Sequence, residues 1–185
     1  MRRFVLASFG ALIFVAAAVT AAMASPRASA LHEHSYRKAL RFYTGEIHRF
    51  QLDTWHWQRV MGIHQTPAGT RGLAAATNVI RLRHLDSLWA HRAKVAHRRA
   101  SHPPHLANWL CIHRYEGSWS DPGAPYYGGL QMDLPFQQAY GAWLLRHKGT
   151  ANHWTPLEQI WTAERARRAR GFYPWPSTAR SCGLL

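Results

Sequence analysis

The tetrapeptide Thr155-Pro156-Leu157-Glu158 is the clearest helix start in this sequence of 185 residues. Threonine is a favoured N-cap, proline suits the first helical position, and a glutamate three residues after the cap completes a capping box. The predicted helix continues to about Arg170 and ends at Gly171, because glycine tolerates the backbone conformation that ends many helices. This stretch predicts that the C-terminal part of the chain is mainly α-helical.

The remainder of the C-terminal region, residues 106–185, is predicted to hold two further helices around a long loop. One covers residues 106–114 and leads to Glu116, and the other covers residues 134–146 with Asp133 as its N-cap. The loop between them, residues 117–129, is rich in glycine, proline, serine and aromatic residues, which favours turns. We therefore expect Glu116 to stand where a helix meets an irregular loop.

Residues 31–61 are predicted to form one long helix, because apolar and aromatic side chains recur at alternating spacings of four and three. These side chains are Tyr36, Leu40, Tyr43, Ile47, Phe50, Thr54, Trp57 and Met61. Proline and glycine in residues 62–72 predict a turn, and residues 73–100 form a second helical stretch. Two helices joined by a short turn suggest an antiparallel hairpin of unknown function, packed on itself or on the C-terminal domain. Residues 101–105, with two prolines, are the predicted domain boundary.

The N-terminus has the order of features found in secretory signals. A positive start, Met1-Arg2-Arg3, precedes an apolar run over residues 4–22 and a small-residue exit, so residues 1–24 are predicted to be a signal peptide. An uncleaved membrane anchor is the rival interpretation, because the run approaches the length that spans a bilayer. Export to an oxidising compartment predicts that the two cysteines, Cys111 and Cys182, form a disulfide.

The net charge of +14, with histidine neutral, implies an anionic partner. Export argues against nucleic acid and leaves the acidic polymers of a cell wall or an acidic membrane surface. The 13 histidines show no spacing typical of a zinc site, so neither a structural metal nor a cofactor is predicted.

Glu116 is the one carboxylate of residues 106–185 without an evident structural role. The other four are Asp121, which opens a turn, Asp133 and Glu158, which cap helices, and Glu164, which can pair with Arg167 or Arg168. A carboxylate at a helix C-terminus opposes the helix dipole, which raises its pKa, and burial beside Trp119 would raise that pKa further. A carboxyl group held protonated is what glycoside cleavage requires of a general acid. A surface glutamate is the alternative.

The segment Tyr126-Tyr127-Gly128-Gly129-Leu130-Gln131 is the second candidate for a functional element. Paired aromatic rings offer flat apolar faces to sugars, paired glycines allow close approach of a backbone, and Gln131 offers a donor and an acceptor. An aromatic hairpin that closes the core explains the same residues equally well.

Together these segments resemble the transglycosylase-like domain of the actinobacterial resuscitation-promoting factors, in the lysozyme-like superfamily. The resemblance covers residues 106–185 and rests on segments that occur in order: His113-Arg114-Tyr115-Glu116-Gly117-Ser118-Trp119, Tyr126 to Gln131, Ala163-Glu164-Arg165, Pro174-Trp175-Pro176 and Cys182. It implies a small α+β lysozyme-like fold and a wall peptidase as partner.

The resemblance also implies roles for single residues. Glu116 matches the catalytic glutamate, and the glycan groove is matched by Trp119, Tyr126, Tyr127 and Gln131. Cys111 and Cys182 would supply the family's disulfide, although the family's cysteine directly precedes the glutamate and Cys111 stands five residues before it. The residues after the glutamate differ, and the segment leading to Tyr126 is shorter than in the family.

The sequence thus predicts a secreted, wall-associated enzyme that cuts the β-1,4 bond between N-acetylmuramic acid and N-acetylglucosamine in peptidoglycan. Glu116 would protonate the leaving oxygen, and either water or the muramic 6-hydroxyl would then attack. The absence of a convincing second carboxylate favours the second ending, that of a lytic transglycosylase. There are two alternatives: a non-catalytic peptidoglycan-binding protein, and a basic protein that binds membrane surfaces or anionic polymers. Apart from the second alternative, the protein would contact a membrane only through an uncleaved N-terminal segment.

Overall fold

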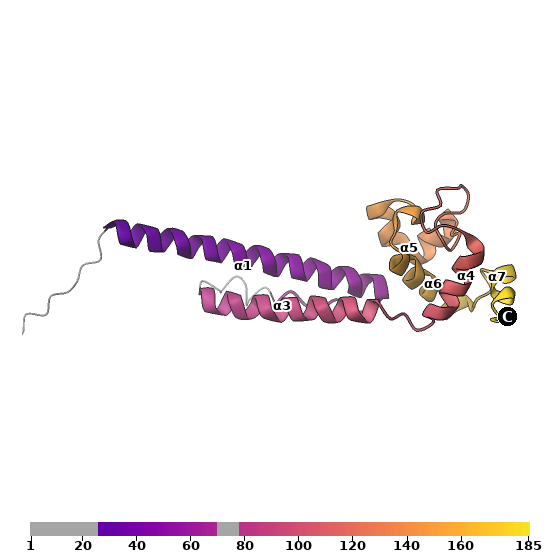
Figure 1. Cartoon of the computed structure of the whole chain (residues 1–185), viewed down its shortest axis with the longest axis horizontal. Coiled ribbons are helices and arrows are strands. Elements are labelled where there is room, and N and C mark those ends of the chain that lie inside the picture. Colours follow the sequence, from indigo (N-terminus) through magenta and orange to yellow (C-terminus); the bar gives the residue numbers. More distant parts are fainter. Residues whose placement is uncertain (1–25, 70–77) are drawn as a thin grey trace, which may run out of the picture. The chain divides into compact units, whose positions relative to one another are not determined.

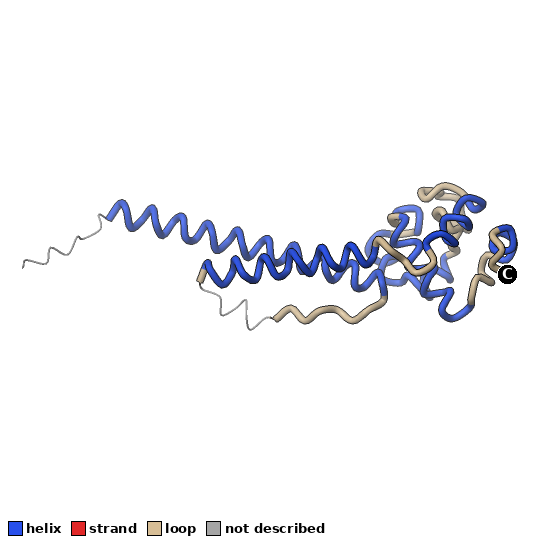
Figure 2. Tube along the Cα trace, turned by 60° about the horizontal axis from the view of Figure 1, so that its bottom comes forward, coloured by secondary structure: helices blue, strands red, loops and turns tan. Residues whose placement is uncertain are grey.

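A computed structural model describes residues 26–69 and 78–185, and this part of the chain is mainly helical (Figures 1 and 2). Its elements are α1 (Pro26–Met61), α3 (Val79–Ala100), α4 (Leu106–Glu116), α5 (Leu134–Lys148), the 3-10 turn η1 (Ala151–His153), α6 (Pro156–Arg170) and α7 (Pro176–Ser181). The described residues contain no strand, and an isolated β-bridge joins Tyr127 to Met132. The expectation of a mainly α fold is confirmed for them.

The chain divides into two units, Met1–Ser35 and Tyr36–Leu185, and every contact discussed below lies within the second. The predicted signal peptide, residues 1–24, lies outside the described residues, as does the predicted helix start at residues 73–77. Among the helices that are described, none combines the length and apolar character needed to cross a membrane.

Helices α1 and α3 run parallel, and the predicted antiparallel hairpin is therefore wrong (Figure 1). Arg83 bonds the Tyr43 hydroxyl near the start of α3, and the Trp55 and Trp89 rings meet at 5.9 Å. Further along, the Trp57 and His97 rings meet at 5.2 Å, so residue numbers rise together along both helices. A small core fills their seam, formed by Ile47, Leu82 and Trp89.

The physical reason for the parallel arrangement is the segment that follows α1. After Met61 the chain turns back and runs along α1 instead of entering α3 at once. Gln58 exchanges two hydrogen bonds with Thr66, Trp55 Nε1 donates to Thr66 O at 2.7 Å, and Gln51 donates to Ala68 O. Side chains of α1 thus satisfy the backbone of this extended return segment, which brings the chain back before α3 begins at its N-cap, Asn78.

The C-terminal ends of α1 and α3 enter the same core as helices α4 to α7. Val60, Met61 and Ala100 are buried together with Trp109, Ile160 and other apolar side chains of residues 106–185. Two hydrogen bonds fix this junction: Trp161 Nε1 donates to Ala100 O at 2.8 Å, and Arg165 donates to Val60 O. Burial, with a smaller effect of neighbouring Arg168, lowers the pKa of Arg165 to about 10.

The predicted helix caps are confirmed. Thr155 accepts from the Glu158 amide while the Glu158 carboxylate accepts from the Thr155 amide at 2.7 Å, and Gly171 follows α6 with a φ of 61°. Asp133 accepts from the Phe136 amide at 2.7 Å at the start of α5. The short helix α7 was not predicted; it begins at Pro176, directly after the buried Trp175.

Candidate functional site

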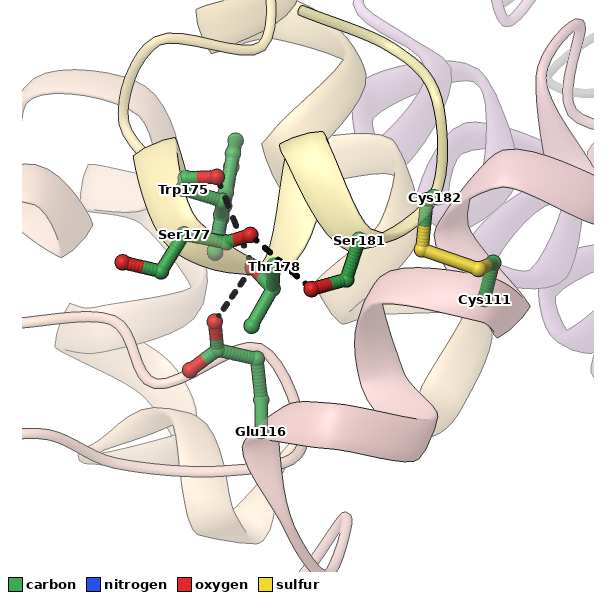
Figure 3. Close-up of a disulfide and its surroundings, with 7 residues drawn as sticks. All are labelled: Cys111, Glu116, Trp175, Ser177, Thr178, Ser181 and Cys182. Carbon is green, nitrogen blue, oxygen red and sulfur yellow. Dashed lines mark hydrogen bonds between the residues drawn. A yellow bond between two sulfur atoms is a disulfide. The ribbon is translucent and has the colours of Figure 1, made fainter.

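The predicted disulfide is present and joins α4 to the end of α7. Cys111 and Cys182 are bonded, with their Cα atoms 6.0 Å apart. Cys111 lies in the middle of α4, and Cys182 is the residue that follows α7 (Figure 3). Because α7 has only six residues, this covalent link is a major restraint on its position beside α4.

Glu116, the last residue of α4, points toward α7 (Figure 3). The Thr178 hydroxyl donates a 2.7 Å hydrogen bond to Glu116 Oε1 and also lies 3.4 Å from Trp175 O. The Glu116 side chain is half-buried, not enclosed in the apolar surroundings expected beside Trp119. The carboxylate is therefore open to a ligand but held in orientation on one oxygen.

The loop after Glu116 is organised around Asp121. Its Oδ1 accepts from the Gly123 amide at 3.0 Å, which confirms the predicted turn, and its backbone carbonyl accepts from the Gly128 amide at 2.8 Å. Its second oxygen, Oδ2, accepts from Gln131 Nε2 at 2.8 Å. Both oxygens of Asp121 thus bond groups of the loop itself.

Gln131 lies in this loop close to the residue that follows Glu116. Its φ is 48°, a left-handed conformation rare for residues other than glycine, and its Nε2 also donates to Gly128 O at 3.0 Å. A Cβ built on Gly117 would stand 3.7 Å from both Gln131 Nε2 and Asp121 Oδ2. The tertiary structure therefore brings Glu116 and Gln131, two of the predicted site residues, into one neighbourhood.

The paired glycines of the loop are fixed by Gln159, a fully buried residue of α6 that sequence reasoning did not single out. Its Oε1 accepts from the Gly129 amide at 2.9 Å, and its Nε2 lies within 2.8–3.1 Å of three backbone carbonyls, those of Trp119, Ala151 and Trp154. A Cβ on Gly128 would stand 2.5 Å from Gln159 Oε1, which explains why glycine is needed there. No local pattern marks this role, since Gln159 and Gly129 are 30 residues apart.

The predicted aromatic residues of the groove fall into two groups. Tyr126 is 50% exposed and shares a pocket with Gln131, whereas Tyr127 is half-buried against the main core. Trp119 also packs against that core and stacks on His113, with ring centroids 3.9 Å apart. Tyr126 therefore remains available to a ligand, while Trp119 and Tyr127 support the loop.

The pocket of Tyr126 and Gln131 has a volume of about 350 Å³. It is also lined by Tyr140, Arg170 and Trp175, and so offers hydroxyl, amide and guanidinium groups beside aromatic surface. Trp175, which lines this pocket, donates a hydrogen bond from Nε1 to Leu130 O at 2.7 Å. The Trp175 carbonyl lies beside the Thr178 hydroxyl that holds Glu116. One short segment thus borders the pocket and positions the carboxylate.

The remaining carboxylates of the region have structural partners. Glu164 is fully buried and forms the predicted ion pair with Arg167 at 3.2 Å. Burial raises the pKa of Glu164, but hydrogen bonds from Trp109, His105 and Arg167 outweigh burial and lower that pKa overall.

Glu158 does more than close the capping box. It is fully buried, accepts from Lys148 Nζ at 2.6 Å and lies 3.1 Å from His56 Nε2 of α1. Burial raises its pKa, but hydrogen bonds from His56, Lys148 and the Thr155 amide prevail and lower the pKa to about 2. Glu158 therefore links α1, α5 and α6.

Within residues 26–69 and 78–185, no three histidine, cysteine, aspartate or glutamate side chains are grouped so that they could hold a metal ion.

Besides Gln159, Thr178 is a residue of the candidate site that the sequence did not reveal, because it lies 62 residues from Glu116 and in an unpredicted helix.

No model of a known protein family matches this chain, and no curated protein matches it.

Proposed function

We propose that the protein cleaves peptidoglycan glycan strands, with Glu116 as the general acid, and that residues 106–185 form a lysozyme-like domain similar to that of the resuscitation-promoting factors. One observation carries the proposal. Glu116 is held on Oε1 by Thr178, whose hydroxyl also lies near the carbonyl of Trp175, a residue that lines a pocket with an exposed tyrosine. The other carboxylates of the region form turns, helix caps or ion pairs.

In this mechanism Glu116 donates its proton to the glycosidic oxygen between N-acetylmuramic acid and N-acetylglucosamine. The bond between that oxygen and the muramic C1 breaks as positive charge develops on the muramic ring. The resulting carboxylate of Glu116 takes the proton of the muramic 6-hydroxyl, whose oxygen attacks C1 and gives a 1,6-anhydro end.

Hydrolysis would require a second carboxylate to direct water or to form a covalent intermediate. Asp121 is the nearest in sequence, but both of its oxygens bond the loop, and Asp133 caps α5. This supports the transglycosylase ending over the muramidase ending. Tyr126 and Gln131 would contact the glycan, with Trp119 and Tyr127 shaping the loop from behind.

Digestion of purified peptidoglycan followed by mass spectrometry of the released muropeptides tests the proposal. The wild type is expected to release anhydro-muropeptides, and Glu116→Gln is expected to release none. Glu46→Gln, which removes a surface carboxylate of α1 that pairs with Arg49, is the charge-matched control and should behave as the wild type. Equal release by the wild type and Glu116→Gln would overturn the assignment, and reducing ends would replace transglycosylation by hydrolysis.

The second candidate is a non-catalytic wall-binding protein, which the partial exposure of Glu116 favours. It predicts that Glu116→Gln still sediments with peptidoglycan and that neither protein releases products. Secretion to the wall and cooperation with a wall peptidase belong to the proposal in both cases. The net charge of +14 favours a third candidate, binding to a membrane surface or an anionic polymer.

A further inference from the structure

A second pocket lies where the C-terminal ends of α1 and α3 meet α6, and it has no part in the proposed cleavage. Its volume is about 540 Å³, within the range of small-molecule sites. Its floor is apolar: Met61 and Trp161 are almost fully buried there, and Ile63 beside them is 36% exposed. An apolar floor that reaches the surface favours a ligand with an apolar part.

The rim of this pocket is strongly basic. Arg98 and Arg99 come from the last turn of α3, and Arg168 comes from α6. In the described part of the chain, no carboxylate forms an ion pair with any of the three, whereas neighbouring Arg167 pairs with Glu164. Arg98 and Arg99 lie in the last turn of α3 and Arg168 lies in the last turn of α6, positions that the helix dipoles favour for basic residues. The packing of the two helix ends brings all three arginines to one pocket.

Basic groups continue around Ile63 beyond this pocket. One adjoining hollow shares Met61, Ile63 and Arg99 with it and adds Arg92, and another combines Ile63 with Arg59. The positive charge is therefore spread over a surface with an exposed apolar side chain near its middle. Such a surface matches an extended anionic layer better than an isolated small anion.

We propose that the arginine pocket, formed by Arg98, Arg99 and Arg168 over Met61, Ile63 and Trp161, binds the phosphate headgroup of an anionic phospholipid. Guanidinium groups form paired hydrogen bonds with phosphate oxygens, which suits them to this ligand. The apolar floor receives the glycerol and the first acyl carbons. A sugar–phosphate polymer would offer the phosphate but no such apolar group. The inference does not depend on the role of Glu116.

Sedimentation of the full, disulfide-bonded chain with lipid vesicles tests this site. Vesicles of phosphatidylcholine alone are compared with vesicles that also contain phosphatidylglycerol. The test variant is Arg98→Gln/Arg99→Gln/Arg168→Gln. The control is Arg41→Gln/Arg81→Gln/Arg146→Gln, which removes three arginines elsewhere and therefore has the same net charge as the test variant. All proteins carry the same N-terminal segment, so its contribution cancels in the comparison.

The wild type is expected to prefer the phosphatidylglycerol vesicles, and the pocket variant to bind them about 100-fold more weakly, since each arginine at such a surface contributes about a factor of five. The control triple variant should lose much less, and Ile63→Ser should weaken binding without any change of charge. Equal losses in both triple variants, or no preference for phosphatidylglycerol, would overturn the proposal. The proposal would also be overturned if glycerol phosphate, at a concentration equal to that of the lipid phosphate, displaced the protein from the vesicles, because the site would then bind free phosphate as well as the lipid.

Discussion

The Thr178 hydroxyl donates a 2.7 Å hydrogen bond to Glu116 Oε1, and this contact joins the end of α4 to α7. The disulfide makes a second connection between the same elements, at Cys111 and Cys182. Cys111 precedes Glu116 in α4, whereas Cys182 follows Thr178 along the α7 segment. The two elements are therefore held at two separate points. The orientation of Glu116 therefore depends on residues far from it in sequence.

Loss of the Thr178 hydroxyl is expected to impair cleavage without unfolding the protein. A hydrogen bond to a charged group is worth about 1.5–3 kcal/mol, so Thr178→Val should lower kcat for muropeptide release about 10- to 100-fold. Thr178→Ser, which keeps the hydroxyl, should retain most of the activity at an unchanged KM. If valine and serine variants had the same kcat, Thr178 would not position Glu116.

Removal of the disulfide is expected to destabilise the protein by about 4 kcal/mol at most, because the bond closes a loop between cysteines 71 residues apart in the unfolded chain. Urea unfolding of the oxidised protein and of Cys111→Ala/Cys182→Ala measures the difference. Since α7 carries Thr178, cleavage should fall in the double variant even at temperatures where it stays folded. Unchanged cleavage in the folded variant would show that α7 keeps its place without the bond.

Gln159→Ala is expected to lower the free energy of unfolding by about 3 kcal/mol or more. The substitution leaves the buried Gly129 amide and the carbonyls that Gln159 now bonds without a partner. Gln138→Ala, at an exposed position of α5, is the matched control and should change stability by less than about 0.5 kcal/mol. Similar midpoints in urea for both variants would contradict a role for Gln159 in fixing the loop.

Two glycine substitutions are expected to change the stability of the protein in opposite directions. Gly128 has a φ of 73°, and a Cβ there would meet Gln159 Oε1 at 2.5 Å, so Gly128→Ala should destabilise the protein by more than about 1 kcal/mol. Gly45 lies within α1, and a Cβ added there would have no neighbouring atom within 4 Å, so Gly45→Ala should stabilise by about 0.5–1 kcal/mol. Thermal unfolding of the two variants gives the sign directly.

The buried Glu158 predicts a particular dependence of stability on pH. Its pKa is about 2 in the folded protein against 4.5 for the free side chain. A lowered pKa contributes stability above about pH 4.5, and this contribution, on the order of 3 kcal/mol, is lost as the pH falls toward 2.

Comparison of the wild type with Glu158→Gln by urea unfolding isolates this contribution. The difference in unfolding free energy should be largest at neutral pH and shrink as the pH falls from about 4.5 to about 2. Glu46→Gln, at an exposed pair with Arg49, should show a much smaller change over the same range. A pH-independent difference for Glu158→Gln would mean that its charge does not stabilise the fold.

The sequence predicted those parts of the fold that depend on nearby residues. The capping box of Thr155 and Glu158 and the N-cap Asp133 were predicted because each involves a hydrogen bond over three residues. The end of α6 at Gly171 was predicted because a single glycine suffices to end a helix. The disulfide was predicted from the expected export to an oxidising compartment, and two cysteines allow only one pairing.

The direction of α3 could not be predicted in the same way. Proline and glycine after Met61 indicated a turn, and nothing in their spacing showed that the chain would first run back along α1. That path is set by hydrogen bonds from Gln51, Trp55 and Gln58, whose side chains look like those of any helix surface. Whether a segment forms a helix depends mainly on nearby residues, whereas the direction of that helix relative to another depends on which distant side chains bond the connecting segment.

The candidate site divides along the same line. From the sequence we predicted that Glu116 ends a helix, that a glycine-rich loop follows it and that the two cysteines form a disulfide. The folded structure was needed to find that Thr178 holds the carboxylate, that Gln159 fixes the loop and that Tyr126, not Tyr127, is exposed in the pocket. The reason is physical: a cap forms between residues a turn apart, but contacts across 30 or 62 residues exist only once the core has packed and brought distant side chains together.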